Sequence, residues 1–250
     1  MERLSFGTLA SQLPRIGGMA TMPSRSQSLR EALPAILPQV ERLYLYLDQY
    51  DHVPADLAAD ARIVPLLRRD GERPMGTSGK LLGLRALSTP CLYFCFDDDI
   101  RYPAGYVARM AAALHRHRYR AVVGVHARVF RPPIRSYIRD GRILNFKDRL
   151  DIDCVVDELG SGTIAFHSRC IRLDPERWEF LNILDLMLTI EAMNQDVQLV
   201  AVNRPAGFMQ AIAENQDDSL YREVLHDDSL QTRLLRSTMA HYPGRWNQAD

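Results

Sequence analysis

This 250-residue sequence has neither an excess of charge of one sign nor a long hydrophobic run. Lys plus Arg and Asp plus Glu each number 31, so the formal net charge is zero and nothing global points to nucleic acid or an anionic membrane as the partner. No apolar run approaches the roughly 20 residues that a membrane-spanning helix needs. Residues 1–14 lack a basic segment followed by an apolar one, so we expect no signal peptide. These absences predict a soluble, cytoplasmic protein without a transmembrane segment, and they leave peripheral contact with the inner face of a membrane open.

Cysteine is also scarce, and its spacing excludes the common cysteine-based sites. The four cysteines are Cys91, Cys95, Cys154 and Cys170, and they include no C-x-x-C pair. Cys91 and Cys95 would share one face of a strand about 13 Å apart, which is too far for a disulfide or a shared metal ion. We therefore expect core residues in a reducing compartment.

What the sequence does contain is an alternation of strand and helix patterns, over a length that can bury a proper core. Apolar or alternating stretches predict strands, and apolar residues at helical spacing predict helices. We expect strands at 15–22, 42–48, 61–67, 91–96, 121–126 and 198–202, and helices that begin near Ser26 and Lys80 and cover 104–117 and 182–195. This order is typical of an α/β fold with a mostly parallel sheet flanked by helices.

Three local features refine this expectation. Ser26 is expected to cap its helix, and Pro34 inside that helix is expected to kink or split it. Pro65 puts the strand at 61–67 near an edge of the sheet, because proline lacks the N–H that strand pairing uses. The stretch from Arg128 to Asp153 is rich in Arg, Pro and Asp and predicts a long loop over one face, of the kind that often carries function.

The most informative stretch runs from Cys91 to Ile100. Six residues that favour burial lead directly into Asp97, Asp98 and Asp99, and three adjacent acids are expected where a strand leaves the sheet. Ligands bind at that edge in open α/β folds. Because side chains alternate along an extended chain, Asp97 and Asp99 should point the same way and Asp98 elsewhere. Two converging carboxylates suit a hard divalent cation that shares its oxygen ligands with a diphosphate, whereas a solvated acidic turn that caps the next helix is the alternative.

Four motifs together resemble glycosyltransferases of the GT-A fold, close to the large family 2 group and to bacterial members that act in surface-polysaccharide synthesis. The segment from Ala20 to Arg25 looks like the first loop that holds the nucleotide, and Asp48 matches the acid that faces the base or ribose. The sequence from Phe96 to Asp99 is similar to the D-x-D metal motif. Gly160-Ser-Gly-Thr-Ile-Ala-Phe-His167, followed by Asp185, looks like the Gly-rich acceptor segment and the catalytic aspartate. The resemblance covers about residues 15–205.

The resemblance implies a single GT-A domain over 1–250, with a nucleotide-binding half at about 15–126, an acceptor-binding half at about 127–210 and a helical tail at 211–250. It implies a metal-dependent, inverting transfer of a sugar from a UDP- or GDP-sugar to a hydroxyl of a glycan or lipid-linked glycan, in capsule, lipopolysaccharide or related synthesis. Asp185 would be the catalytic base, and Asp97 and Asp99 would hold Mn²⁺ or Mg²⁺. The remaining residues implied are Thr21, Pro23, Arg25, Asp48, Lys80, Asp97 and Asp98 for the nucleotide sugar, and Glu158, Gly160, Ser161, Gly162 and His167 on the acceptor side.

Several alternatives stay open at this point. Many family members have Glu before the catalytic acid, whereas Leu184 precedes Asp185 here, so Asp157 and Glu158 are rivals for the base. A haloacid-dehalogenase-like phosphatase also puts Asp-x-Asp after a hydrophobic strand, but there it follows the first strand. A sugar-nucleotide pyrophosphorylase would need a Gly-rich, Arg-bearing first loop that is absent here. A nucleotide-sugar binding module without catalysis would use the same donor residues.

Overall fold

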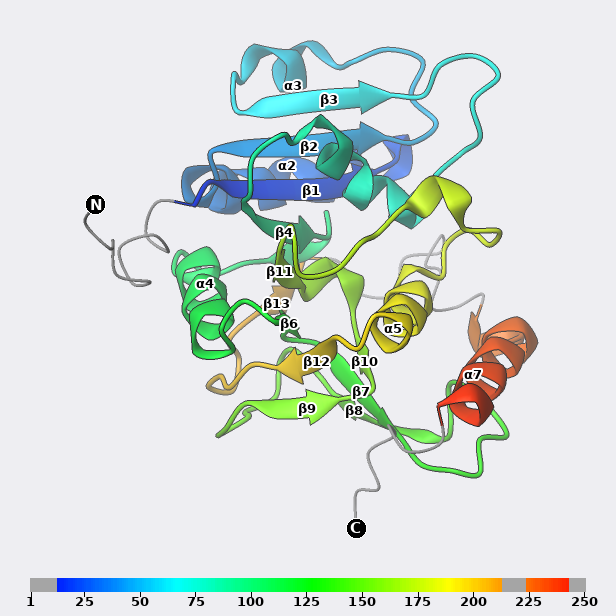
Figure 1. Ribbon diagram of the computed structural model, residues 1–250. Coiled ribbons are helices and arrows are strands. Elements are labelled where there is room, and N and C mark those ends of the chain that lie inside the picture. The colour runs from blue at the N-terminus through cyan, green and yellow to red at the C-terminus, as the bar shows by residue number, and fades with distance from the viewer. Residues whose placement is uncertain (1–12, 213–223, 243–250) are drawn as a thin grey trace, which may run out of the picture.

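An eight-stranded sheet forms the centre of the computed structural model, which describes residues 13–212 and 224–242 (Figure 1). Its strand order is β3-β2-β1-β4-β11-β6-β12-β9. Neighbours pair in parallel except at β11, which is antiparallel to both β4 and β6, and at β9, which is antiparallel to β12. The strands are β1 (Arg15–Thr21), β2 (Arg42–Leu47), β3 (Ile63–Leu67), β4 (Leu92–Phe96), β6 (Ala121–Gly124), β9 (Cys154–Val156), β11 (Ala165–His167) and β12 (Gln198–Ala201). The predicted mostly parallel sheet is confirmed, with β3 and its Pro65 at an edge.

Helices cover both faces of this sheet. The α-helices are α2 (Ser26–Ile36), α3 (Ala55–Ala59), α4 (Tyr106–Arg116), α5 (Leu184–Asn194) and α7 (Ser229–His241), and the 3-10 helices are η1 (Pro23–Arg25), η2 (Leu37–Gln39), η3 (Gly76–Ala86), η4 (Ser161–Thr163) and η5 (Pro175–Arg177). Apolar residues of α2 and α4 pack on one face, and those of η3 and α5 pack on the other. Successive side chains of a strand point to opposite faces of the sheet. Phe94 of β4 therefore packs in the first core cluster, with α2 and α4, and Tyr93 packs in the second, with η3 and α5. The strand before the acids is therefore buried on both sides, as its composition predicts.

The segment from Arg128 to Asp153 is only in part the loop that its composition predicts, because residues 128–130 and 141–144 lie in strands. It contributes to a three-stranded sheet in the order β10-β7-β8, made of β10 (Glu158–Leu159), β7 (Ala127–Phe130) and β8 (Gly141–Leu144). The scattered apolar residues have partners because β7 pairs with both other strands. A further small pair joins β5 (Ile100–Arg101) to β13 (Gln210–Ala211).

The structure corrects the expected cap of α2 and shows that Pro34 does not split this helix. Ser26 is its first helical residue rather than its cap, and the capping position, Arg25, makes no side-chain capping hydrogen bond. Pro34 lies inside α2 without splitting it, because only Ala35 and Ile36 follow before the helix ends and the chain continues into η2. The hydrogen bond lost at Pro34 therefore falls in the last turn, where the buried Leu33 and Ile36 hold the helix on the sheet.

The part of the tail that the structure describes packs against α5 and residues 130–138. In the third core cluster, Leu235 of α7 meets Leu186 of α5 and residues 130–138. Residues 213–223 and 243–250 of the predicted tail lie outside the described ranges.

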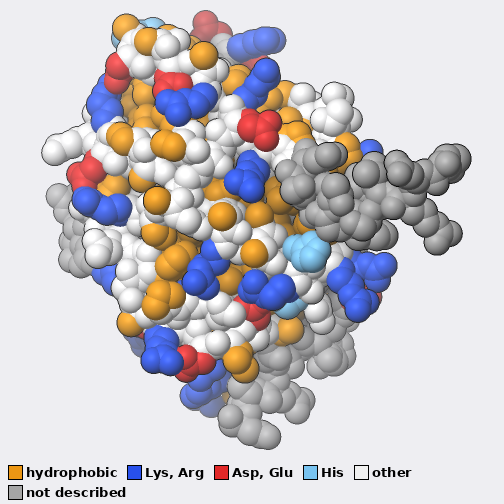
Figure 2. All heavy atoms as spheres, turned by 90° about the vertical axis from the view of Figure 1, so that its left-hand side faces the viewer, with side chains coloured by type: hydrophobic (Ala, Val, Ile, Leu, Met, Phe, Trp, Pro, Cys, Tyr) orange, Lys and Arg blue, Asp and Glu red, His pale blue; other side chains and the backbone are white. Residues whose placement is uncertain are grey.

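The described surface agrees with the balanced charge of the sequence. On the face that Figure 2 shows, side chains of both charges and hydrophobic side chains are interspersed. No helix in the described ranges has the length and apolar character needed to cross a bilayer. All four cysteines are free, and Cys91 and Cys95 are buried in the core as predicted.

Candidate active site

A cavity of about 650 Å³ lies at the carboxyl ends of β1, β2 and β4. One end is lined from the parallel strands by Ala20, Thr21, Met22, Arg25, Asp48, Gln49, Asp97, Asp98 and Asp99. The opposite end is lined from β7, β10, α5, α7 and the segment 137–146. The strand ends converge at this edge because the strands that carry them are parallel. The residues predicted for the donor thus share one space with those predicted for the acceptor.

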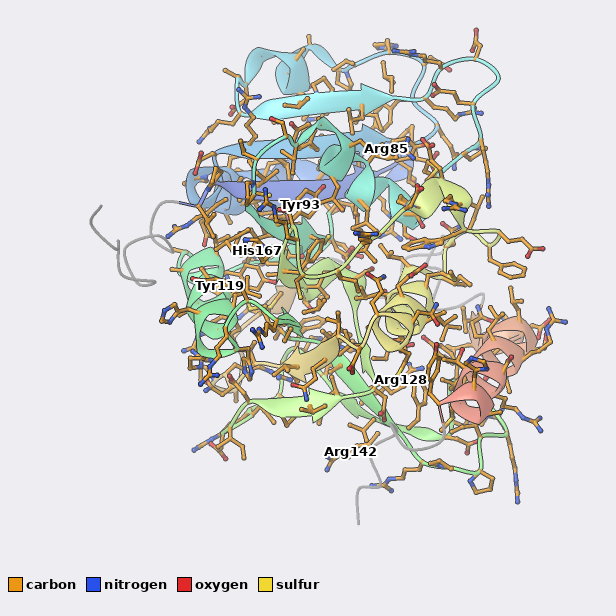
Figure 3. The ribbon with its side chains drawn as sticks, viewed as in Figure 1. Arg85, Tyr93, Tyr119, Arg128, Arg142 and His167 are labelled. Carbon is orange, nitrogen blue, oxygen red and sulfur yellow. The ribbon has the colours of Figure 1, made fainter. Side chains whose placement is uncertain are left out.

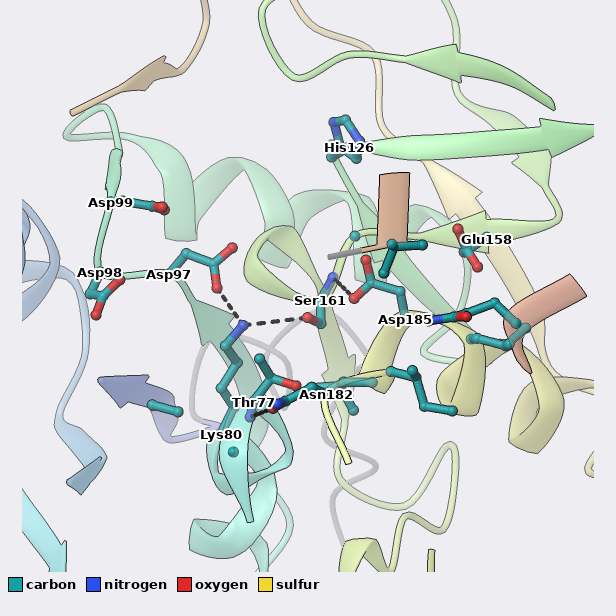
Figure 4. Close-up of a pocket in the computed structure, with 18 of the residues that line it drawn as sticks. Thr77, Lys80, Asp97, Asp98, Asp99, His126, Glu158, Ser161, Asn182 and Asp185 are labelled. Carbon is teal, nitrogen blue, oxygen red and sulfur yellow. Dashed lines mark hydrogen bonds and ion pairs between the residues drawn. The ribbon is translucent and has the colours of Figure 1, made fainter. Parts of the chain in front are cut away.

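The three adjacent acids do not point the same way. In the turn after β4, Asp97 and Asp99 project to the same side and Asp98 projects away from them (Figure 4). Asp98 is buried and accepts a hydrogen bond of 2.6 Å from Thr21 Oγ1. Burial raises the pKa of Asp98 to about 6, although the hydrogen bond from Thr21 and the charge of Arg25 oppose this. Asp98 therefore joins the acidic turn to the loop after β1, while its two neighbours face the cavity.

Two cationic side chains contact the acids. Arg25 Nη1 is 2.9 Å from Asp99 Oδ2 and 3.6 Å from Asp98 Oδ1. The buried Lys80 forms an ion pair with Asp97, and its Nζ is 3.4 Å from Ser161 Oγ. Burial lowers the pKa of Lys80, but the charge and hydrogen bond of Asp97 more than offset this, so the net pKa is raised. Lys80 is therefore an ammonium ion in the site and not a general base.

Lys80 does not open a helix, as the sequence suggested. It lies in the middle of η3, a 3-10 helix that begins at Gly76. Gly79 and Gly83 let this segment lie directly on β2: a Cβ atom at Gly79 would be 2.1 Å from Tyr46 Cδ1, and one at Gly83 would be 2.5 Å from Tyr44 Cγ. This close packing carries Lys80 into the protein instead of leaving it solvated.

Asp97 and Asp99 fit a cation that takes its other ligands from a substrate. Burial, and then the charge of Asp97, raise the pKa of Asp99, which shows that negative charge is crowded here. Within residues 13–212 and 224–242, no group of three or more His, Cys, Asp or Glu side chains could hold a metal ion. Two carboxylates leave most positions of a hard cation to diphosphate oxygens and water. The carboxylates of Asp97 and Asp99 therefore suit an ion that binds together with a second ligand better than an ion that the protein holds alone.

The Gly-rich segment connects Asp97 to Asp185. Asp185 lies in the first turn of α5, and its Oδ1 accepts a 2.9 Å hydrogen bond from the backbone N–H of Ser161 (Figure 4). Gly162 lies against the acidic turn, where a Cβ atom would be 1.8 Å from Asp97 Oδ2. Gly160 packs on His126, where a Cβ atom added at Gly160 would be 3.0 Å from His126 Cδ2. The segment thus holds the acid of α5 across the cavity from the acids of β4.

The two rivals for the base lie in different surroundings. Asp157 is buried outside the cavity lining, and its Oδ2 accepts a 2.7 Å hydrogen bond from the backbone of Phe130. Glu158 lines the cavity and accepts a 2.8 Å hydrogen bond from the hydroxyl of Tyr137. Burial raises the pKa of Glu158 to about 7, opposed by Arg128. Asp157 therefore has a structural position, whereas Glu158 faces the cavity.

Two predicted site residues lie elsewhere. Pro23 is exposed at the start of η1 and does not line the cavity. His167 ends β11, and because β11 is antiparallel to β4, this end lies at the opposite edge of the sheet. Its ring centroid is 5.8 Å from that of Tyr119, beside α4 (Figure 3). No feature of the sequence indicated that β11, the strand after the glycines, would be antiparallel to its neighbours.

The cavity also holds polar residues that are not among the predicted site residues. The described part of the chain has five buried polar side-chain atoms without a hydrogen-bond partner, and three belong to residues that line the cavity: Thr77 Oγ1, His126 Nδ1 and Gln231 Oε1. A buried polar atom without a partner costs about 1–3 kcal/mol. Their gathering around one cavity gives a bound polar ligand or water three buried atoms with which to form hydrogen bonds. Gln231 had no recognisable signal, because only the packing of α7 brings it here.

Comparison with known proteins supports the fold. No model of a known protein family matches the sequence, and no curated protein matches it. Among solved structures, 130 chains match. One is the crystal structure of GalNAc-T7 with UDP, GalNAc and Mn²⁺, which is similar at a TM-score of 0.61 and 9% identity, over 95% of this chain and 52% of that one. The chain therefore spans about half of that protein, and the likeness confirms the predicted GT-A, Rossmann-like fold.

Proposed function

We propose that this chain is a metal-dependent, inverting glycosyltransferase that transfers a sugar from a nucleoside-diphosphate sugar to a hydroxyl of a glycan or lipid-linked glycan. UDP- and GDP-sugars are the proposed donors, and capsule, lipopolysaccharide or a related polysaccharide is the proposed product. One observation carries the proposal: Asp97 and Asp99 face Asp185 across a single cavity that Lys80 and Arg25 also line. The nucleotide, sugar and Mn²⁺ in the GalNAc-T7 structure belong to the same ligand classes.

The donor end of the cavity suits a nucleoside diphosphate. Asp48 directly follows β2, its backbone N–H donates a 2.9 Å hydrogen bond to the carbonyl of Thr21, and its side chain is proposed to face the base or ribose. Lys80 and Arg25 carry positive charge next to the acids and would bind phosphate oxygens. Asp97 and Asp99 would hold the Mn²⁺ or Mg²⁺, which when bound neutralises charge on the diphosphate as a Lewis acid.

Asp185 is proposed to accept the proton of the acceptor hydroxyl. As that oxygen bonds to the anomeric carbon, the bond from this carbon to the diphosphate breaks and its electron pair stays on the phosphate oxygen. A single displacement of this kind inverts the anomeric configuration. The N–H of Ser161 holds one oxygen of Asp185, which fixes the carboxylate toward the cavity. General-base assistance is typically worth about 10²–10⁴ in rate.

The fold weakens the phosphatase alternative. A haloacid-dehalogenase-like phosphatase would carry its Asp-x-Asp pair after the first strand, whereas these acids follow β4, the fourth strand in the chain. A binding module without catalysis would bind the same nucleotide sugar but would not release the sugar. Turnover therefore separates it from an enzyme.

A thermal-shift panel of nucleotide sugars with and without Mn²⁺ tests donor binding, and sugar release from the stabilising donor tests catalysis. We expect stabilisation by one donor that requires the metal. Asp185→Asn should keep this stabilisation, since the amide oxygen can still accept from Ser161, and should lower transfer about 10²–10⁴-fold. Glu158→Gln, assayed in parallel, tests the remaining rival for the base. The proposal is wrong if no nucleotide sugar binds, and Asp185 is not the base if Asp185→Asn retains full transfer. The anomeric configuration of the product, read by NMR, tests inversion.

A further inference from the structure

The two ends of the cavity differ in character. The donor end carries the acids and the two cations, whereas the end beneath α7 carries a wall of apolar side chains. This wall, called the apolar wall below, consists of Ile138, Ile143, Phe146, Leu186 and Val224. Leu186 follows the proposed base directly in sequence, so the wall begins where the reaction is proposed to occur.

The apolar wall reaches the protein surface. Leu186 is buried within the third core cluster, and Ile138 and Val224 pack against that cluster while remaining half-exposed. Phe146 is also half-exposed, with its ring centroid 5.9 Å from that of His126. Ile143 is 38% exposed. Leu186, Ile138 and Val224 therefore share one cluster, whereas Phe146 packs against the first core cluster. A ligand that covers the solvent-accessible side chains of the apolar wall would gain from burial.

Polar groups lie beside this wall. Gln231 of α7 is only 8% exposed, lines the cavity, and has no hydrogen-bond partner for its Oε1. Nδ1 of His126 also lacks a partner, and Glu158 presents a carboxyl group held by Tyr137. Amide, imidazole and carboxyl groups together both donate hydrogen bonds to sugar hydroxyls and accept them. This end of the cavity thus pairs sugar-binding chemistry with an apolar exit.

We propose that the end of the cavity beneath α7 binds an amphipathic acceptor, whose sugar lies against Gln231, His126 and Glu158 and whose apolar aglycone lies along the apolar wall. This inference rests on the proposed function and narrows its acceptor to a sugar joined to an apolar group. A purely hydrophilic glycan would leave the apolar wall uncovered.

The test compares short and long aglycones on the same sugar. The full chain is assayed with Mn²⁺ and the donor found by thermal shift. The acceptors are the methyl and octyl glycosides of glucose, galactose, mannose and N-acetylglucosamine, and each octyl glycoside is kept below its critical micelle concentration. Each buried methylene contributes about fourfold, so burial of three should raise kcat/KM for the octyl glycoside about 50-fold over the methyl glycoside. If no glycoside is a substrate, the same comparison is made on inhibition of donor hydrolysis.

Matched variants locate the effect. Ile143→Asn and Val224→Asn should each reduce the octyl-to-methyl ratio at least about fourfold, as expected when one methylene-sized contact or more is lost. Ile152→Asn is the control, because Ile152 is 73% exposed and does not line the cavity, and it should leave the ratio unchanged. Gln231→Leu should lower transfer to both glycosides relative to donor hydrolysis, and Gln231→Glu, which keeps an acceptor oxygen, should restore part of it.

The possible outcomes separate this inference from the proposed function. Donor hydrolysis with equal use, or equal inhibition, by methyl and octyl glycosides overturns the amphipathic acceptor and leaves the transferase standing. A preference for octyl that survives both Ile143→Asn and Val224→Asn also overturns it, because the aglycone would then lie elsewhere. If no nucleotide sugar is bound or hydrolysed, the proposed function fails and this inference fails with it.

Discussion

Replacing Glu158 with Gln should change how the stability of this protein depends on pH. Glu158 is buried, accepts a hydrogen bond from Tyr137, and has Arg128 Nη1 3.8 Å from its Oε1. Burial is the main cause that raises its pKa from 4.5 to about 7, with Arg128 opposing the rise and Asp185 adding to it. Gln resembles the protonated form in shape and can still accept from Tyr137. The substitution therefore removes the titration while keeping the contact.

The sign follows from the direction of the pKa shift. A carboxyl group whose pKa is higher in the folded state than in the unfolded state binds its proton more tightly when folded. The stability that it contributes is fully present below about pH 4.5 and is lost as the pH rises through about 7. A shift of this size corresponds to roughly 3 kcal/mol over the whole range, and roughly 2 kcal/mol of it falls between pH 5 and pH 8.

Urea unfolding at pH 5, 6, 7 and 8 measures this effect. The free energy of unfolding of the unsubstituted protein should fall relative to that of Glu158→Gln by roughly 2 kcal/mol from pH 5 to pH 8. Glu179→Gln is the matched control, because the Glu179 side chain is exposed, and its curve should run parallel to that of the unsubstituted protein. Parallel curves for Glu158→Gln as well would refute the reasoning, since they would mean that Glu158 titrates alike in the folded and unfolded states.

Three further predictions follow from the site. Gly162→Ala should lower transfer at least about tenfold, since a Cβ atom there would be 1.8 Å from Asp97 Oδ2 and would displace Asp97. The control is Gly105→Ala, where a Cβ atom has nothing within 4 Å; it should leave transfer within twofold, and equal rates for the two variants would contradict the prediction. His167→Ala should also stay within twofold because His167 lies at the opposite edge of the sheet, and a large loss measured by kcat/KM would overturn that placement. Calorimetry should detect little Mn²⁺ binding without nucleotide and clear binding with it, and this dependence should disappear in Asp99→Ala; tight binding of the ion alone would mean that the protein supplies more ligands than Asp97 and Asp99.

The sequence contained enough to predict the sheet and the position of the three acids at the end of a buried strand. The stretch from Cys91 to Phe96 is apolar at every position because β4 is covered on both faces, and the acids follow where the strand ends. Pro65 indicated an edge strand for a local chemical reason, and β3 is at the edge. Such features can be predicted from the sequence because their physical cause lies in the residue itself or in its immediate neighbours.

Features that depend on contacts between distant segments could not be read in the same way. Lys80 was expected near the start of a helix, yet it lies in the middle of η3, which Gly79 and Gly83 let pack on the tyrosines of β2, far away in sequence. His167 follows the glycines in the segment that resembles the family, but β11 is antiparallel to β4, so His167 lies beside Leu92 at the start of β4, away from the cavity. Gln231 enters the cavity through the packing of α7 on α5, which a polar helix pattern does not reveal.

The charges around the acidic turn explain why nucleotide binding should depend on a metal. Three carboxylates, Asp97, Asp98 and Asp99, contact two cationic side chains, Lys80 and Arg25, so with all groups ionised the cluster carries one net negative charge. A diphosphate alone would add like charge in a partly buried site, where Coulomb repulsion is stronger than in water. With a divalent cation it would add far less, and the ion would also take over contacts with Asp97 and Asp99 while Lys80 and Arg25 turn to the phosphate. Nucleotide binding would then exchange the ion-pair partners of these side chains instead of adding net charge to the site. This exchange requires both the acidic and the cationic side chains of the cavity.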